Sequence, residues 1–155
     1  MEILIRLSPD RVVPKAVLFD FDGTLSTLRH GWEGIMEPMM LEMISGADPA
    51  DDKLAAAVRE YISQSTGIQT IFQMQWLSRM VHTYGKNPGM PEDPWWYKAE
   101  YNKRLMEPVG KRIESIRSGE KRAEDFLVGG SMEFLRLLKK SGLEIYVASG
   151  TDHGD

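Results

Sequence analysis

The chain has 155 residues, of which 42% are hydrophobic and 27% charged, a composition typical of globular proteins. Its net charge of −4 gives no sign of a nucleic-acid-binding surface, and no apolar run approaches the ~20 residues of a membrane span, so we expect neither nucleic acid nor membrane as a partner. The lack of cysteine excludes disulfides, thiol nucleophiles and thiolate metal sites, and it is compatible with the cytoplasm, where we expect the protein.

Two short apolar runs near the start of the chain predict strands. Residues 2–7 are expected to form an edge strand or a linker. Residues 16–21 lead into a glycine turn, which predicts a strand buried on both faces, as in a parallel sheet. Because side chains alternate along a strand, Asp20 and Asp22 point the same way, while Phe19 points the other way.

Apolar residues at helical spacing then predict four helices in succession. The second is expected to be capped by the aspartates at 51–52, and the third to open with a capping box formed by Thr66 and Gln69. Pro38 is expected to kink or start the first helix, and Pro108 to bend or break the fourth. The predicted helices cover residues 33–44, 51–64, 66–84 and 95–118.

A fifth helix and a second strand follow. Ser131 is expected to cap a helix that runs to residue 140. Its inward-facing residues are expected to be Phe134, Leu135, Leu137 and Leu138. Residues 143–148 then predict an apolar strand, which ends in the turn at Ser149-Gly150-Thr151.

The distance between the two strands predicts two structural parts. About 100 mostly helical residues separate them, whereas a crossover between parallel strands needs only a dozen or so residues. We therefore expect a core formed by residues 1–28 and 127–155, and a helical unit formed by residues 29–126. The methionines of this unit, with Trp76, Trp95 and Trp96, are interpreted as its packed interior.

The stretch Asp20-Phe21-Asp22-Gly23-Thr24-Leu25 carries the strongest chemical signal. Two carboxylates close together are costly unless a hard cation such as Mg²⁺ binds them or one of them holds a proton. The hexapeptide resembles the first motif of the haloacid dehalogenase-like (HAD) hydrolase superfamily. The resemblance implies that Asp20 is the nucleophile and Asp22 the general acid and base. It also implies that both aspartates are Mg²⁺ ligands and that Gly23 and Thr24 contact the substrate.

The end of the second strand carries a weaker signal. A hydroxyl and free backbone N–H groups at a strand-to-helix turn suit an anion. Residues 143–151 resemble the second HAD motif, which makes the Ser149 hydroxyl and the Gly150 N–H ligands of the phosphate. The implied fold is α/β: a partial doubly wound, Rossmann-like HAD core with an inserted all-helical cap.

The activity that the resemblance implies is Mg²⁺-dependent hydrolysis of a small phosphorylated metabolite through an aspartyl-phosphate, closest to the phosphoglycolate-phosphatase-like branch. Asp22 argues against a dehalogenase, because halide leaves without a proton and that branch lacks this residue. Two alternatives stay open. A phosphomutase shares both aspartates and needs a bisphosphate activator, and a non-catalytic fragment or interaction module need not bind Mg²⁺.

Two further expectations concern the rest of the chain. Arg29 and His30, or Gly67-Ile68-Gln69-Thr70, could contact the non-phosphate end of a substrate, although a solvated loop and a helix cap are the simpler interpretation. The family pattern continues with a lysine and an acidic motif, and neither follows Asp155. We therefore expect this chain alone to be essentially inactive and to self-associate through an unpaired sheet edge.

Overall fold

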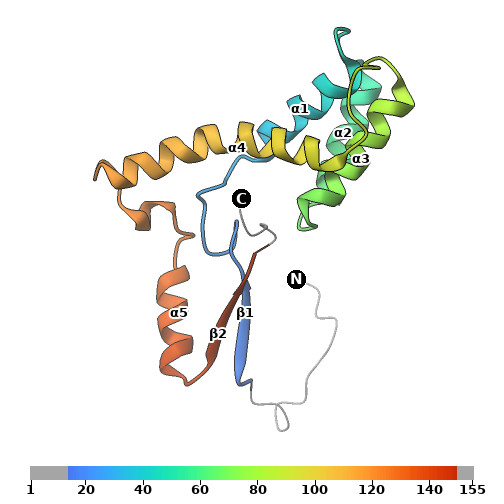
Figure 1. Ribbon diagram of the computed structural model, residues 1–155. Helices are drawn as coiled ribbons and strands as arrows, with labels where there is room; N and C mark the ends of the chain where they lie inside the picture. The colour runs from blue at the N-terminus through green and yellow to red at the C-terminus, as the bar shows by residue number, and fades with distance from the viewer. Residues whose placement is uncertain (1–13, 150–155) are drawn as a thin grey trace.

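The computed structural model describes residues 14–149, so the strand expected at residues 2–7 lies outside the described part of the chain. In chain order the elements are β1 (Ala16–Asp20), α1 (Glu33–Ser45), α2 (Asp52–Gln64), α3 (Thr70–Tyr84), α4 (Pro94–Arg117), the 3₁₀ helix η1 (Ala123–Phe126), α5 (Ser131–Lys140) and β2 (Glu144–Ala148). They form a sheet lobe (β1, β2 and α5) and a helical lobe (α1–α4), and α4 runs across the carboxyl ends of the strands (Figure 1). The predicted α/β class is confirmed, with a short parallel sheet consistent with a partial Rossmann-like core.

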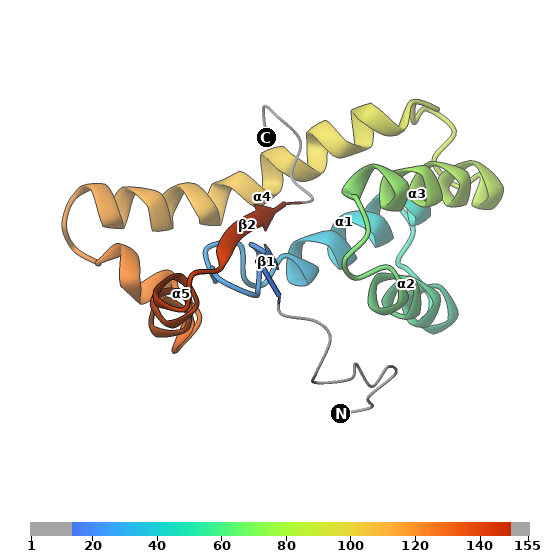
Figure 2. The ribbon, with the colours of Figure 1, turned by 90° about the horizontal axis from the view of Figure 1, so that it is seen from below.

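The helical lobe is built around one apolar cluster. α1 contacts α2, α3 and α4, and α3 lies along α4, so that α1–α3 gather beside the N-terminal half of α4 (Figure 2). The predicted methionine interior is confirmed for the five methionines of this cluster, whereas Met106 is exposed. The cluster consists of Met36, Met39, Met40, Met43, Ile44, Leu54, Val58, Ile62, Met74, Leu77, Val81, Tyr97, Tyr101, Leu105 and Val109. Within the described residues, no helix combines the length and apolar character needed to cross a bilayer.

The helices follow the predicted start, stop and break signals only in part. Asp51 caps α2 as expected, because the Leu54 N–H donates to its Oδ1 at 2.7 Å. Thr66 does not open α3, since its Oγ1 donates to the Ile62 carbonyl at 3.0 Å and so closes α2 instead. α4 continues unbroken through Pro108, which lies well inside it. Packing of the apolar face of α4 outweighs the lost hydrogen bond at that proline.

Trp95 and Trp96 lie outside the apolar cluster, and the prediction that they pack in the interior is wrong. Their side chains are 58% and 43% exposed. The buried stripe of α4 runs through Tyr97, Tyr101, Leu105 and Val109, at the four-residue spacing of one helix face. The two tryptophans precede this stripe and lie beside it. Trp76, by contrast, is half-buried and stacks on Tyr61, with ring centres 3.9 Å apart.

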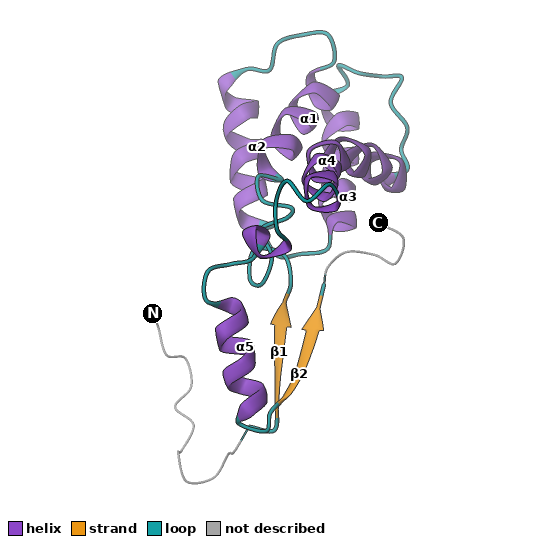
Figure 3. Cartoon of the chain, turned by 90° about the vertical axis from the view of Figure 1, so that its left-hand side faces the viewer, coloured by secondary structure: helices purple, strands orange, loops and turns teal. Residues whose placement is uncertain are grey.

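The sheet lobe has one covered face and one open face. β1 and β2 pair in parallel, with Leu18 beside Tyr146 and Phe19 beside Val147. α5 covers the Phe19 face, where the rings of Phe19 and Phe134 meet edge to face at 6.0 Å. No element of residues 14–149 covers the other face, on which Leu18 is 69% exposed (Figure 3). The prediction of a strand buried on both faces is therefore wrong here, because a single helix covers only one face of a sheet.

α5 starts and packs differently from the prediction. Ser131 is its first helical residue rather than its cap, and the Ser131 Oγ is buried without a hydrogen-bond partner among the described residues. Of the apolar residues expected to face inward, Leu135 and Leu138 are half-buried. Phe134 and Leu137 stay exposed, because the two strands are too narrow to cover the whole apolar face of the helix.

Two chain segments connect the lobes, and they lie side by side. The Thr27 N–H donates to the Phe126 carbonyl at 2.8 Å, and the Val128 N–H donates to the Leu25 carbonyl at 3.0 Å. Between them Ser26 is buried, and its hydroxyl donates to the Phe126 carbonyl at 3.4 Å. The chain therefore enters and leaves the helical lobe at one place, next to the end of β1.

Gly46, directly after α1, is a position where we expect a large effect on stability. Its φ is +63°, and an added Cβ would lie 3.0 Å from the Lys86 carbonyl oxygen. Gly46→Ala should therefore lower the free energy of unfolding by about 1–3 kcal/mol, because backbone strain adds to the close contact. Gly110→Ala is the control, since a Cβ there meets no atom within 4 Å and alanine favours a helix interior. Thermal unfolding followed by circular dichroism measures both, and equal midpoints would contradict the prediction.

Candidate active site

A cavity of about 230 Å³ lies where the carboxyl end of β1 meets the helical lobe. Its walls come from three places: the segment from the end of β1 to the residue before α1, the α2–α3 connection with the start of α3, and the middle of α4. The lining residues are Asp20, Asp22, Arg29, Trp32, Thr66, Gly67, Ile68, Thr70, Gln73, Tyr101, Asn102 and Leu105. The carboxyl ends of strands are where ligands bind in open α/β sheets.

The two aspartates of the first motif both line this cavity. Asp20 is the last residue of β1 and is exposed, whereas Asp22 is half-buried two residues later. A tight turn holds Asp22, because the Gly23 N–H donates to the Ser26 carbonyl at 2.7 Å and the Leu25 N–H donates to the Phe21 carbonyl at 3.0 Å. The alternation that the sequence predicts thus brings both carboxylates to the same cavity wall.

Gly23 and Thr24 lie beside the cavity and are not among its lining residues. Gly23 has a φ of +78°, a value that side chains rarely adopt, so this turn requires glycine. The Thr24 Oγ1 lies 3.5 Å from Asp20 Oδ2, at the outer limit of a hydrogen bond. In this structure the two residues shape the turn around the aspartates.

Ser149 follows β2 and is exposed. The strand register sets Ala148 beside Asp20, so the chain leaves β2 at the same end of the sheet as the aspartates. Ser149 is not among the lining residues of the cavity, and Gly150 lies outside the described residues. The two motifs thus reach the same edge of the sheet, but only the first contributes to this cavity.

The helical lobe contributes residues that the sequence analysis considered as contacts for a substrate. Arg29, Gly67, Ile68 and Thr70 line the cavity, whereas His30 does not. Gln69 is also absent from the lining and is the N-cap residue of α3. Arg29 is the only basic residue among the described residues that line the cavity.

Tyr101 on α4 forms a buried wall of the cavity and was not singled out from the sequence. The residue is 4% exposed, and burial raises the pKa of its phenol above the usual value. The positive charge of Arg29 lowers that pKa, while the negative charges of Glu33 and Asp22 raise it. The phenol therefore stays protonated at neutral pH and keeps its capacity to donate a hydrogen bond.

The other residues missed by the sequence analysis are Trp32, Thr66, Gln73, Asn102 and Leu105. Gln73 is a polar residue within a buried stretch of α3, and its Nε2 donates to the Ser65 Oγ at 3.0 Å. The polar Gln73, at a buried position of this helix, was the one signal in the sequence that could have indicated the wall formed by α3. Nothing local in α4 points to Asn102, because its place at the cavity depends on how α4 crosses the strands.

The two aspartates fit a magnesium ion. Carboxylate oxygens are ligands that Mg²⁺ prefers, and this ion is often held by only one or two of them because it keeps water molecules and shares phosphate oxygens. Among residues 14–149, no group of three or more His, Cys, Asp or Glu gathers as a metal cluster. The ion would be held by the Asp20 carboxylate and by the backbone carbonyl of Asp22, so that the Asp22 carboxyl can carry a proton.

The comparison with protein families agrees with this geometry. A family model described as haloacid dehalogenase-like hydrolase matches residues 14–154, a span that includes β1, the whole helical lobe and β2. No curated protein and no solved structure matches the chain. The match extends over most of the sequence and contains the aspartates that line the cavity. The chain therefore belongs to the haloacid dehalogenase-like hydrolases.

Proposed function

We propose that this protein is a Mg²⁺-dependent phosphatase that hydrolyses small phosphate monoesters, close to the phosphoglycolate-phosphatase-like branch of its family. The observation that carries the proposal is the meeting of Asp20, Asp22 and Arg29 at one cavity. A nucleophile, a proton donor and a cation for the phosphate are the groups that this reaction needs.

The proposed reaction has two steps. In the first, an Asp20 carboxylate oxygen attacks phosphorus, the bond to the ester oxygen breaks, and the Asp22 carboxylic acid gives its proton to the departing alkoxide. In the second, the Asp22 carboxylate takes a proton from water, whose oxygen attacks the aspartyl-phosphate and releases inorganic phosphate and free Asp20. A carboxylate nucleophile divides one difficult displacement into two easier ones.

The rest of the cavity supports a small substrate. Its volume of about 230 Å³ leaves little room beyond a phosphate and a short leaving group. Arg29 supplies a positive charge and Tyr101 a protonated phenol, both suited to oxygen atoms of the substrate. Mg²⁺ bound by Asp20 and Asp22 would neutralise charge on the phosphate.

In this proposal the helical residues 29–126 form a cap over a core of residues 1–28 and 127–155. Support comes from the apolar cluster of α1–α4, which contains no residue of β1, β2 or α5. The paired segments next to β1 hold the two connections of the cap together. A cap of this kind excludes water from the site and supplies the contacts that select the leaving group.

The proposal is tested by Asp22→Asn with two classes of ester. Removing a general acid should slow hydrolysis of an alkyl phosphate by about 10²–10⁴-fold. It should slow p-nitrophenyl phosphate far less, because an aryloxide leaves with little help from a proton. Phosphate release is measured with the protein in excess over the ester, so that a single round of chemistry is read directly.

Four results would count against the proposal. Equal decreases in the rate of phosphate release from both esters would argue against Asp22 as the general acid. Phosphate release at the same rate with Mg²⁺ and with a chelator would show that the reaction does not depend on Mg²⁺. Turnover that requires a bisphosphate activator would indicate a phosphomutase instead, and the absence of both Mg²⁺ binding and phosphate release would indicate a non-catalytic module.

A further inference from the structure

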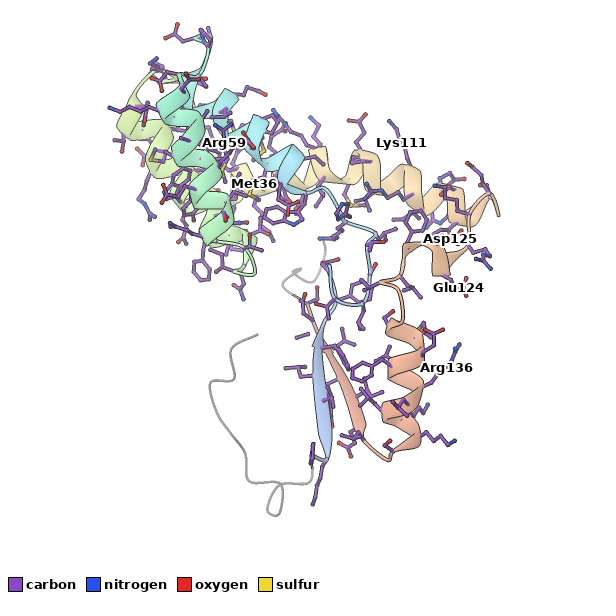
Figure 4. All side chains as sticks on the ribbon, turned by 180° about the vertical axis from the view of Figure 1, so that it is seen from behind. Met36, Arg59, Lys111, Glu124, Asp125 and Arg136 are labelled. Carbon is purple, nitrogen blue, oxygen red and sulfur yellow. The ribbon has the colours of Figure 1, made fainter. Side chains whose placement is uncertain are left out.

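Arg112, three residues beyond the last buried position of α4, holds the loop that follows the first motif. Its Nη1 donates to the Leu28 carbonyl oxygen at 2.5 Å and to the His30 carbonyl oxygen at 3.0 Å. These two acceptors lie on either side of Arg29 in the chain. Lys111, the preceding residue, extends from the outer side of α4 instead (Figure 4).

The helix α4 therefore forms one wall of the cavity and also holds the loop that carries Arg29, which lines another wall. Tyr101 lines the cavity, and Arg112 lies about three turns further along α4, on nearly the same face of the helix. Since α4 is one continuous helix, the position of this wall and the position of Arg29 are linked through it.

Two other hydrogen bonds shape this loop. The Leu28 N–H donates to the Ser26 Oγ at 3.1 Å, and the His30 N–H donates to the Thr27 carbonyl at 3.0 Å. Both bonds are local in the sequence, so they shape the loop without attaching it to the helical lobe. The bonds from Arg112 span more than eighty positions and tie the backbone around Arg29 to α4.

We propose that Arg112 is a positioning residue, which fixes the backbone on both sides of Arg29 so that the Arg29 guanidinium is held at the cavity for the anionic part of the ligand. This inference rests on the proposed function only in naming a phosphate ester as that ligand. A bond from a charged donor to two carbonyls is strong and directional, which suits it to hold a short loop in one conformation.

The test compares Arg112→Gln with Arg117→Gln. Both changes remove one positive charge from the C-terminal part of α4, but Arg117 is exposed and lines no part of the cavity. We expect Arg112→Gln to raise the Kd for inorganic phosphate about tenfold or more. Arg117→Gln should leave this Kd unchanged. Arg112→Lys should restore part of the affinity, because an ammonium group can reach a carbonyl but lacks the planar fork of arginine.

A double-mutant cycle separates positioning from a general structural role. If Arg112 acts through Arg29, then Arg112→Gln should weaken binding of inorganic phosphate in the wild-type background and have almost no further effect in Arg29→Gln. Binding is followed by titration calorimetry and by the fluorescence of Trp32, which lines the cavity. Additive losses in the cycle, or a lower melting temperature with unchanged phosphate affinity, would overturn the inference.

The experiments can reject the positioning role of Arg112 and the proposed hydrolase activity independently of each other. If the wild-type chain binds phosphate in an Arg112-dependent way but releases none from any ester, the proposed hydrolysis fails and the positioning role stands. Amide hydrogen exchange at residues 28–31 gives a readout that needs no ligand. Exchange there that is no faster in Arg112→Gln than in Arg117→Gln would overturn the positioning role whatever the activity.

Discussion

We expect Asp20→Asn to lower phosphate release by at least about 10³-fold, since it removes the nucleophile while preserving the shape of the side chain. The fold should stay intact, because Asp20 is exposed and its hydrogen bond with the Thr24 hydroxyl is long, at 3.5 Å. Mg²⁺ should also bind more weakly, because its carboxylate ligand is lost. Phosphate release under single-round conditions and calorimetric titration with Mg²⁺ measure the two effects.

Asp52→Asn is the matched control for this experiment. Asp52 is an exposed aspartate in the first turn of α2, outside the cavity, so the same chemical change there should leave phosphate release within about twofold of the wild type. Circular dichroism of both variants shows whether the fold is kept. Retention of more than a few per cent of the wild-type rate by Asp20→Asn would rule out Asp20 as the nucleophile.

The second large effect concerns self-association, which we propose occurs through the sheet lobe between two copies of this chain. Leu18 and Tyr146 are neighbours on the open face of the sheet, where they are 69% and 54% exposed. β1 also pairs with β2 alone within residues 14–149, so its other edge has free backbone groups. In an antiparallel pairing of two copies of β1 centred between residues 17 and 18, Lys15 of each copy lies opposite Asp20 of the other, which matches opposite charges.

Leu18→Lys should therefore shift the chain from oligomer to monomer. A lysine places a charge in the middle of the open face, a device that sheet proteins use against association. Phe72→Lys is the control, because Phe72 is a comparably exposed apolar residue on α3, away from the sheet. Sedimentation velocity over a hundredfold range of concentration measures both variants. A wild-type chain that stays monomeric throughout this range would contradict the prediction.

Much of the local structure could be predicted because its causes are local. The spacing of apolar residues predicts α1 and α2 closely, and Asp51 predicts where α2 begins, since capping depends on a residue and its near neighbours. Two of the errors arose where a local signal had two possible uses. Thr66 closes α2 instead of opening α3, and Ser131 starts α5 instead of capping it.

The sequence by itself determined the α/β class, the separation of two parallel strands by a long helical segment, and the motif that identifies the family. Only the tertiary structure decided which distant residues lie beside Asp20 and Asp22. Tyr101 and Asn102 reach the cavity because α4 crosses the carboxyl ends of the strands, and no local pattern records that crossing. The tertiary structure likewise decided that Leu18 is exposed, since burial of a strand face depends on what packs against it and not on how apolar the strand is.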